Sequence, residues 1–237
     1  MNFYDYFNGI TAVINVLFGF SAGFYFLIKY MKTKKGLLPL VGLLMITLGS
    51  FYLGPATSFG FLLFGKNILG NVYAYLSYTS TPLAMIFAMI LGFNIFKTEW
   101  RFKILWIFIP IAILFWIFFY IFPDMSFIYT LEPVDPEFTE QLMDISFIGV
   151  LLVINAFYIL GSVAVLGGGF FILSRKIKGT AEFKKAIALG IGWIFFGISG
   201  ALDALLSEIY PFMIAPARAL MLAAYILIFL GFRPSKN

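Results

Sequence analysis

Two charged residues lie inside consecutive apolar runs near the end of the chain. Asp203 falls in the run Ala186–Leu206 and Arg218 in the run Ala215–Phe232, and a short segment that contains Pro211 joins the two. A charge at the centre of a bilayer costs about 2.5–3.5 kcal/mol on insertion scales, so each group needs a partner or a water-filled cavity. We expect Asp203 and Arg218 to neutralise each other, either as a pin between two helices or as the lining of a pocket that binds a ligand or ion.

Three further polar residues are candidates for binding a ligand. Glu208 follows Asp203 near the expected outer end of the same helix, and Asn15 and Asn155 each lie within an apolar run. A buried Asn side chain hydrogen-bonds either to a neighbouring helix or to a bound solute. The candidate ligand-binding group is therefore one base, two acids and two amides, and packing between helices is the alternative role for each of them.

The side chains that most membrane redox enzymes use are missing. The chain contains no Cys and no His, which excludes disulfides, thiol nucleophiles, His-ligated haem or copper, and an imidazole base for a serine hydrolase. Asp203 is the only acid within an apolar run, whereas an aspartyl protease requires two facing acids. We expect no catalytic residue, no cofactor and no enzyme activity.

The composition is that of an integral membrane protein. Of the 237 residues, 62% are hydrophobic and 11% are charged, whereas soluble domains are about half apolar and a quarter charged. The net charge of +5 comes from Lys and Arg that flank apolar runs, which is typical of membrane orientation and not of nucleic-acid binding. We expect one domain, residues 1–237, that crosses the cell membrane several times with the lipid bilayer as its main partner.

Apolar runs of roughly 20 residues can cross about 30 Å of hydrocarbon as helices. Seven such runs predict an all-α membrane protein, a bundle of seven transmembrane helices at residues 7–30, 37–53, 71–96, 104–122, 146–173, 186–206 and 215–232. The Gly-rich stretch Gly54–Gly70 is expected to be a loop that lies in the interface or re-enters the bilayer edge.

Local signals predict how the spans pack and bend. Gly19 and Gly23 have the GxxxG spacing that lets another helix approach closely. The third span starts with three tyrosines, Tyr73, Tyr75 and Tyr78, which suit a belt of aromatic residues at the membrane interface. Pro82 lies inside that span and is expected to kink it, because proline removes a helical hydrogen bond.

The distribution of basic residues predicts the orientation. The loops after the first, third and fifth spans and the C-terminal tail carry four, three, five and two basic residues, 14 of the 16 in the chain. Only Lys66 and Arg218 lie on the other side, so the first set is cytoplasmic and the N-terminus is outside. The loop 123–145, whose charges are all acidic, then faces outward. Its carboxylates match no EF-hand spacing, so we expect a solvated loop and no metal site.

Short sequence features also recur between the two halves of the chain. Three pairs of spans share them: Gly23 with Gly169, Gly42 and Gly49 with Gly190 and Gly197, and Leu91-Gly92-Phe93 with Leu230-Gly231-Phe232. This pattern predicts a three-plus-one-plus-three layout, a parallel repeat about an axis along the membrane normal. Chance similarity between apolar segments is the alternative.

The stretch Leu202–Phe232, with its segments LDALL and RALMLAAYILIFLGF, resembles the seven-helix sensor region that precedes some histidine kinases and stand-alone archaeal proteins of that kind. The resemblance implies a sensor or receptor-like fold and carries over no catalytic residue. Microbial rhodopsins share the layout but carry a retinal lysine in the last helix, where this chain has Ala223, Ala224 and Tyr225, so we expect no retinal. Sugar transporters of the SWEET type also share it, but no Pro here is followed by Gln.

These observations favour a sensor or receptor-like bundle that binds a ligand from the outer side. Its inner loops are too short to hold an output domain, so it would act through a separate cytoplasmic or membrane partner that docks on the basic inner face. The alternatives are a small-solute transporter or channel built on the repeat, and an accessory subunit of a membrane complex.

Overall fold

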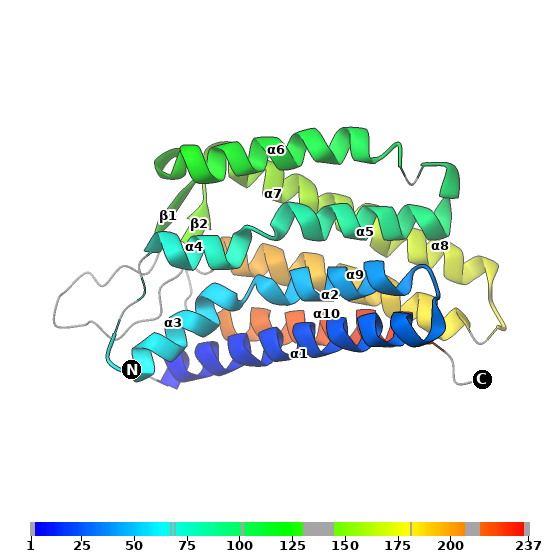
Figure 1. Ribbon diagram of the computed structural model, residues 1–237, viewed down its shortest axis with the longest axis horizontal. Coiled ribbons are helices and arrows are strands. Elements are labelled where there is room, and N and C mark those ends of the chain that lie inside the picture. The colour runs from blue at the N-terminus through cyan, green and yellow to red at the C-terminus, as the bar shows by residue number, and fades with distance from the viewer. Residues whose placement is uncertain are drawn as a thin grey trace.

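The computed structural model describes residues 3–66, 68, 70–100, 102–129, 145–180, 182–206 and 214–234. Within them the fold is all-α apart from one short antiparallel ribbon, and the helices form an elongated bundle (Figure 1). The helices are α1 Phe3–Thr33, α2 Leu38–Ser50, α3 Leu53–Leu63, α4 Gly70–Tyr78, α5 Thr81–Phe96, α6 Leu105–Ile121, α7 Gly149–Gly161, α8 Gly168–Lys176, α9 Glu182–Leu206 and α10 Ile214–Phe232. The ribbon pairs β1 Phe127–Tyr129 with β2 Ile145–Phe147.

Several of these helices are long and apolar enough to cross a membrane. Four segments meet that test by length and composition: Tyr6–Thr33, Gly70–Phe96, Gly149–Lys176 and Glu182–Asp203. The pair α2 and α3, bent by 44°, is a fifth candidate, and α6 and Pro216–Phe232 are shorter apolar helices. The helices therefore fit a membrane-embedded protein.

Within the predicted loop Gly54–Gly70, residues 54–63 belong to α3 Leu53–Leu63, so the prediction of a loop is wrong for those residues. The bend of 44° between α2 and α3 fits either a broken span or a re-entrant segment. Pro55 lies in the first turn of α3, where a missing N–H removes no helical bond. A Cβ at Gly54 would lie 2.5 Å from the carbonyl oxygen of Tyr73, so this glycine lets α3 pack directly against α4. Gly54 and Pro55 therefore lie at the start of a helix, and Gly54 allows that helix to pack closely against α4.

The third predicted span breaks next to Pro82, as the sequence predicts. α4 ends at Tyr78, α5 begins at Thr81, and Pro82 occupies the first turn of α5. A helix break leaves carbonyl oxygens without helical donors. The Thr79 carbonyl oxygen accepts a hydrogen bond of 3.0 Å from Nε1 of Trp116 on α6, so the neighbouring helix satisfies the break.

The fifth predicted span begins three residues later than expected. Residues 145–147 form β2, and α7 starts at Gly149, whose φ of +54° turns the chain from the ribbon into the helix. α7 then continues through a π-helix at Ser162–Gly167 into α8. Most of the predicted acidic loop, residues 130–144, lies outside the described residues.

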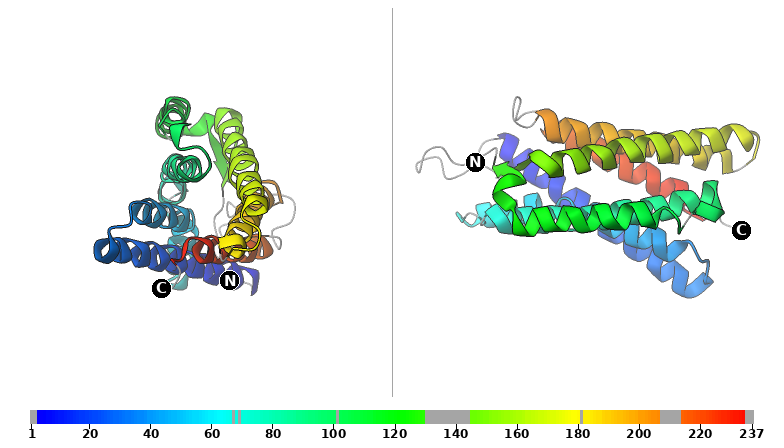
Figure 2. Two further views of the ribbon diagram at one scale, coloured as in Figure 1. Left: turned by 90° about the vertical axis from the view of Figure 1, so that its right-hand side faces the viewer. Right: turned by 90° about the horizontal axis from the view of Figure 1, so that it is seen from above.

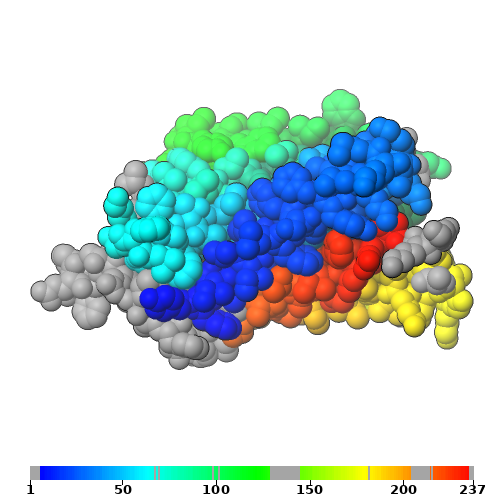
Figure 3. All heavy atoms as spheres, turned by 60° about the horizontal axis from the view of Figure 1, so that its bottom comes forward, coloured from blue at the N-terminus to red at the C-terminus, as the bar shows by residue number. Residues whose placement is uncertain are grey.

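The predicted GxxxG contact is present between α1 and α2. A Cβ at Gly19 would lie 2.5 Å from the Cα atom of Gly49, and a Cβ at Gly23 would lie 2.8 Å from the carbonyl oxygen of Gly42. We call this contact the α1–α2 glycine seam. Seen from above, α1, α2 and α10 run obliquely to the remaining helices (Figure 2), and α10 lies beside α1 on the lower face (Figure 3).

Candidate functional site

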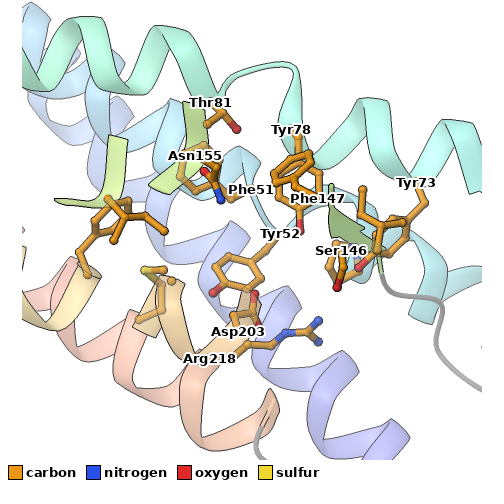
Figure 4. A pocket seen from close by; sticks show the side chains of 16 residues that line it. Phe51, Tyr52, Tyr73, Tyr78, Thr81, Ser146, Phe147, Asn155, Asp203 and Arg218 are labelled. Atoms are coloured by element: carbon orange, nitrogen blue, oxygen red, sulfur yellow. The ribbon is translucent and has the colours of Figure 1, made fainter. Parts of the chain in front are cut away.

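A cavity of about 90 Å³ lies between the helices at the end of the bundle where α9 ends and α10 begins (Figure 4). Six parts of the chain line it: the α2–α3 junction, α4–α5, β2, α7, α9 and α10. The lining residues are Phe51, Tyr52, Pro55, Tyr73, Tyr78, Thr81, Ile145, Ser146, Phe147, Asn155, Ile159, Phe196, Gly200, Asp203, Arg218 and Met221.

The predicted acid and base both line this cavity from adjacent helices. Arg218, on α10, is only 3% exposed, and its Nη1 donates a hydrogen bond of 3.0 Å to the carbonyl oxygen of Asn8 on α1. Its guanidinium carbon lies 5.7 Å from the centre of the Tyr52 ring, within the range of a cation–π contact. Asp203, near the end of α9, is half-buried. Figure 4 shows both side chains reaching the cavity on the side of the Tyr52 ring.

The structure separates the other three candidates. Asn155 on α7 lines the cavity opposite the charged residues. Asn15 on α1 is fully buried and is not among the lining residues, and its Nδ2 donates hydrogen bonds to the carbonyl oxygens of Thr11 at 2.9 Å and of Arg218 at 3.2 Å. It therefore ties α1 to α10, which is the packing role that the sequence left open. Glu208 lies outside the described residues.

Aromatic and hydroxyl side chains that the sequence did not single out as a site complete the wall. Tyr73, expected in an interfacial belt, is fully buried and faces the cavity together with Tyr78 and Thr81. The signal that could have found them is Pro82, because a broken span within a membrane protein is tolerated where it is buried in protein or lines a cavity. The break between α4 and α5, where Trp116 donates a hydrogen bond to the Thr79 carbonyl oxygen, also places Thr81 at the cavity wall.

The ribbon contributes one side of the cavity. Ser146 and Phe147 of β2 line it, and the Phe147 ring packs edge-on against Tyr78 with ring centroids 4.7 Å apart. The backbone N–H of Ile148 donates to the carbonyl oxygen of Ser126, which fixes β2 to the segment that follows α6. The cavity is therefore bounded by the bundle and by a segment outside the helices.

We compared the chain with protein-family models, curated proteins and solved structures. None of them matches. The chemistry of the cavity is therefore read from its own side chains. Among the described residues, its lining carries one negative and one positive side chain, and the rest are uncharged. A ligand that balances both charges is itself neutral overall, with a cationic and an anionic group, because a single charge would leave one buried partner uncompensated.

Proposed function

We propose that the chain crosses the membrane seven times, with its basic rim in the cytoplasm. Two observations support this. Each of the seven predicted runs coincides with a straight or bent helical segment, and α1 begins at the opposite end of the bundle from the end of α10 (Figure 1). Among the described Lys and Arg, all but Lys66 and Arg218 lie at the end where α1, α5, α8 and α10 finish. The cavity is at the other end, so it faces outward.

Because the chain has no Cys, single cysteines can test this orientation. Lys66 and Lys178 are both exposed and belong to opposite ends of the bundle. In intact cells, a maleimide that does not cross membranes is expected to label Lys66→Cys and to leave Lys178→Cys unlabelled, and permeabilised cells should label both. Labelling of Lys178→Cys alone in intact cells would reverse the orientation and turn the cavity toward the cytoplasm.

We propose further that the protein is a sensor or receptor-like bundle that binds a small zwitterionic solute from outside and acts through a separate partner on the basic inner face. The observation that carries the proposal is the cavity that joins Asp203, Arg218 and aromatic walls at the end away from that face. Toward the inner side, core residues such as Phe26, Leu44 and Phe170 are at most 1% exposed, so the bundle is packed beyond the cavity. A binding site that is closed on its inner side suits a receptor.

Thermal unfolding of the purified protein in detergent tests the binding. L-Alanine carries both charges, whereas acetate and methylamine carry one each. We expect saturable stabilisation by L-alanine, about 2.7 kcal/mol at a hundred times its Kd, and none by either single-charge solute. Asp203→Asn should abolish the stabilisation, and Asp124→Asn, an exposed acid outside the cavity, should retain it. Equal stabilisation by acetate or methylamine alone would contradict a zwitterion site.

A small-solute transporter is the second candidate, and the glycine contacts favour it because they support the internal repeat. A Cβ at Gly23 would meet the Ile46 side chain and the carbonyl oxygen of Gly42, and a Cβ at Gly167 would meet Ile194 and the carbonyl oxygen of Gly190 in the same way. Gly49 packs on Gly19 as Gly197 packs on Val163. The contacts thus pair Gly23 with Gly167, one half-turn from the Gly169 that the sequence suggested. Saturable uptake of L-alanine into proteoliposomes would favour transport over sensing.

A further inference from the structure

A second, smaller cavity of about 40 Å³ lies directly behind the first. The two cavities share five lining residues, among them Phe51 and Phe196, whose ring centroids are 6.4 Å apart, and the polar side chains of Thr81 and Asn155. We call it the inner cavity. A volume of this size exceeds the roughly 10–15 Å³ that one water needs and holds one small chemical group.

Three residues that line the inner cavity carry a buried side-chain group with no hydrogen-bond partner in the part of the chain that the structure describes. The groups are Nε1 of Trp193 on α9, the hydroxyl of Tyr158 on α7 and the hydroxyl of Thr81 on α5. These residues are 1%, 4% and 8% exposed, respectively. An unsatisfied buried polar group is unfavourable and uncommon in native proteins, and three around one cavity indicate a place for a polar partner. Trp Nε1–H can only donate, so that partner must accept a hydrogen bond.

We propose that the inner cavity binds the uncharged far end of the ligand, and that this end carries a hydrogen-bond acceptor such as an amide carbonyl. This inference rests on the proposed zwitterion site, which holds the other end at Asp203 and Arg218. Trp193 and Asp203 are ten residues apart on α9, which is about 15 Å along the helix. The remaining wall of the inner cavity is apolar, including Ala84, Met85 and Ala88. The ligand is therefore an elongated zwitterion whose apolar chain ends in an acceptor.

Three probes distinguish the two parts of the site. L-Alanine has the zwitterionic head alone, and Nε-acetyl-L-lysine adds an apolar chain that ends in an amide. L-2-Aminononanoic acid has a chain of the same length without the amide. Affinities are measured by isothermal titration calorimetry on the whole protein in nanodiscs. We expect Nε-acetyl-L-lysine to bind at least tenfold more tightly than the other two, which corresponds to about one well-formed hydrogen bond.

Two phenylalanine variants provide a matched pair. Tyr158→Phe removes a hydroxyl without a partner, whereas Tyr225→Phe removes a buried hydroxyl that donates at 2.6 Å to the carbonyl oxygen of Leu48. Without ligand, Tyr158→Phe should melt at or above the parent temperature and Tyr225→Phe below it. With Nε-acetyl-L-lysine, Tyr158→Phe should lose about tenfold in affinity and keep its affinity for L-alanine.

Each of the other outcomes contradicts a specific part of the proposal. If L-alanine binds but Nε-acetyl-L-lysine binds no better, and Tyr158→Phe changes neither affinity, the inner cavity is not part of the site and the zwitterion site stands. If 2-aminononanoic acid binds as tightly as Nε-acetyl-L-lysine, the inner cavity binds an apolar end, and the proposal that this end carries a hydrogen-bond acceptor is wrong. If none of the three probes binds, the zwitterion site fails and the inference fails with it.

Discussion

Arg218→Ala is expected to lower the free energy of unfolding by about 1.5–3 kcal/mol, the range for losing a buried hydrogen bond that involves a charged group. The side chain is almost fully buried, donates to the carbonyl oxygen of Asn8 and packs on the ring of Tyr52. Its loss leaves the Asn8 oxygen without that donor and leaves the carboxylate of Asp203 in the same cavity without the neighbouring positive charge. Unfolding in detergent, followed by circular dichroism against temperature or denaturant, measures the change.

Arg233 provides the matched control, because it is an exposed arginine just after α10. Arg233→Ala should shift the stability by less than about 0.5 kcal/mol. Arg218→Lys should recover part of the loss, since it keeps the charge but lacks the planar guanidinium that donates to Asn8 and lies 5.7 Å from the centre of the Tyr52 ring. An Arg218→Ala protein that melts at the parent temperature would mean that the arginine is not buried, and the cavity would lose the base on which the proposed function depends.

The second large effect is expected at the α1–α2 glycine seam. A methyl group at Gly19 would lie 2.5 Å from the Cα atom of Gly49, so Gly19→Ala forces two backbones apart. Overpacking of this kind costs about 1–3 kcal/mol, and backbone atoms relax less readily than a flexible side chain. We expect a correspondingly lower melting temperature in detergent, even though alanine is the better helix former.

Gly168→Ala isolates the steric part of this effect. Gly168 is also helical, in α8, and no described atom outside its own helix lies within 4 Å of where its Cβ would be. Both substitutions gain the same helix propensity, about 1 kcal/mol at most, so Gly168→Ala should be neutral or slightly stabilising. Equal melting temperatures for the two variants would show that α1 and α2 do not pack as closely as their glycines allow.

Much of the helical plan follows from hydropathy alone. The runs that carry Asp203 and Arg218 form α9 and α10, and the two charges line one cavity because a single short connection places their helices side by side. Pro82 correctly predicts the break between α4 and α5. Gly19 and Gly23 correctly predict a close helix contact, because only a residue without a side chain permits backbones to touch.

The sequence-based predictions are wrong where the same local composition is compatible with two different structures. Gly54 and Pro55 read as loop residues but begin α3, since a first helical turn tolerates both and the packing against Tyr73 requires the glycine. Asn15 and Asn155 look equivalent in sequence, yet one bonds α1 to α10 and the other lines the cavity, because hydropathy does not tell which way a helix is turned. The ribbon residue Ser146 lies in three residues that are too few to give an alternating strand pattern.

The π-helix at Ser162–Gly167 separates the part of the α7–α8 span that lines the cavities from the part that packs against α9. Asn155 and Tyr158 line the cavities before it, and Gly167, its last residue, packs against α9. Each residue of a regular helix turns the chain by about 100°, so one residue more or fewer between those points would rotate the Asn155 and Tyr158 side chains away from the cavities. The direction of these side chains therefore depends on the number of residues in the span. Amino-acid composition does not reveal this dependence, and deletion of a single residue would change the direction.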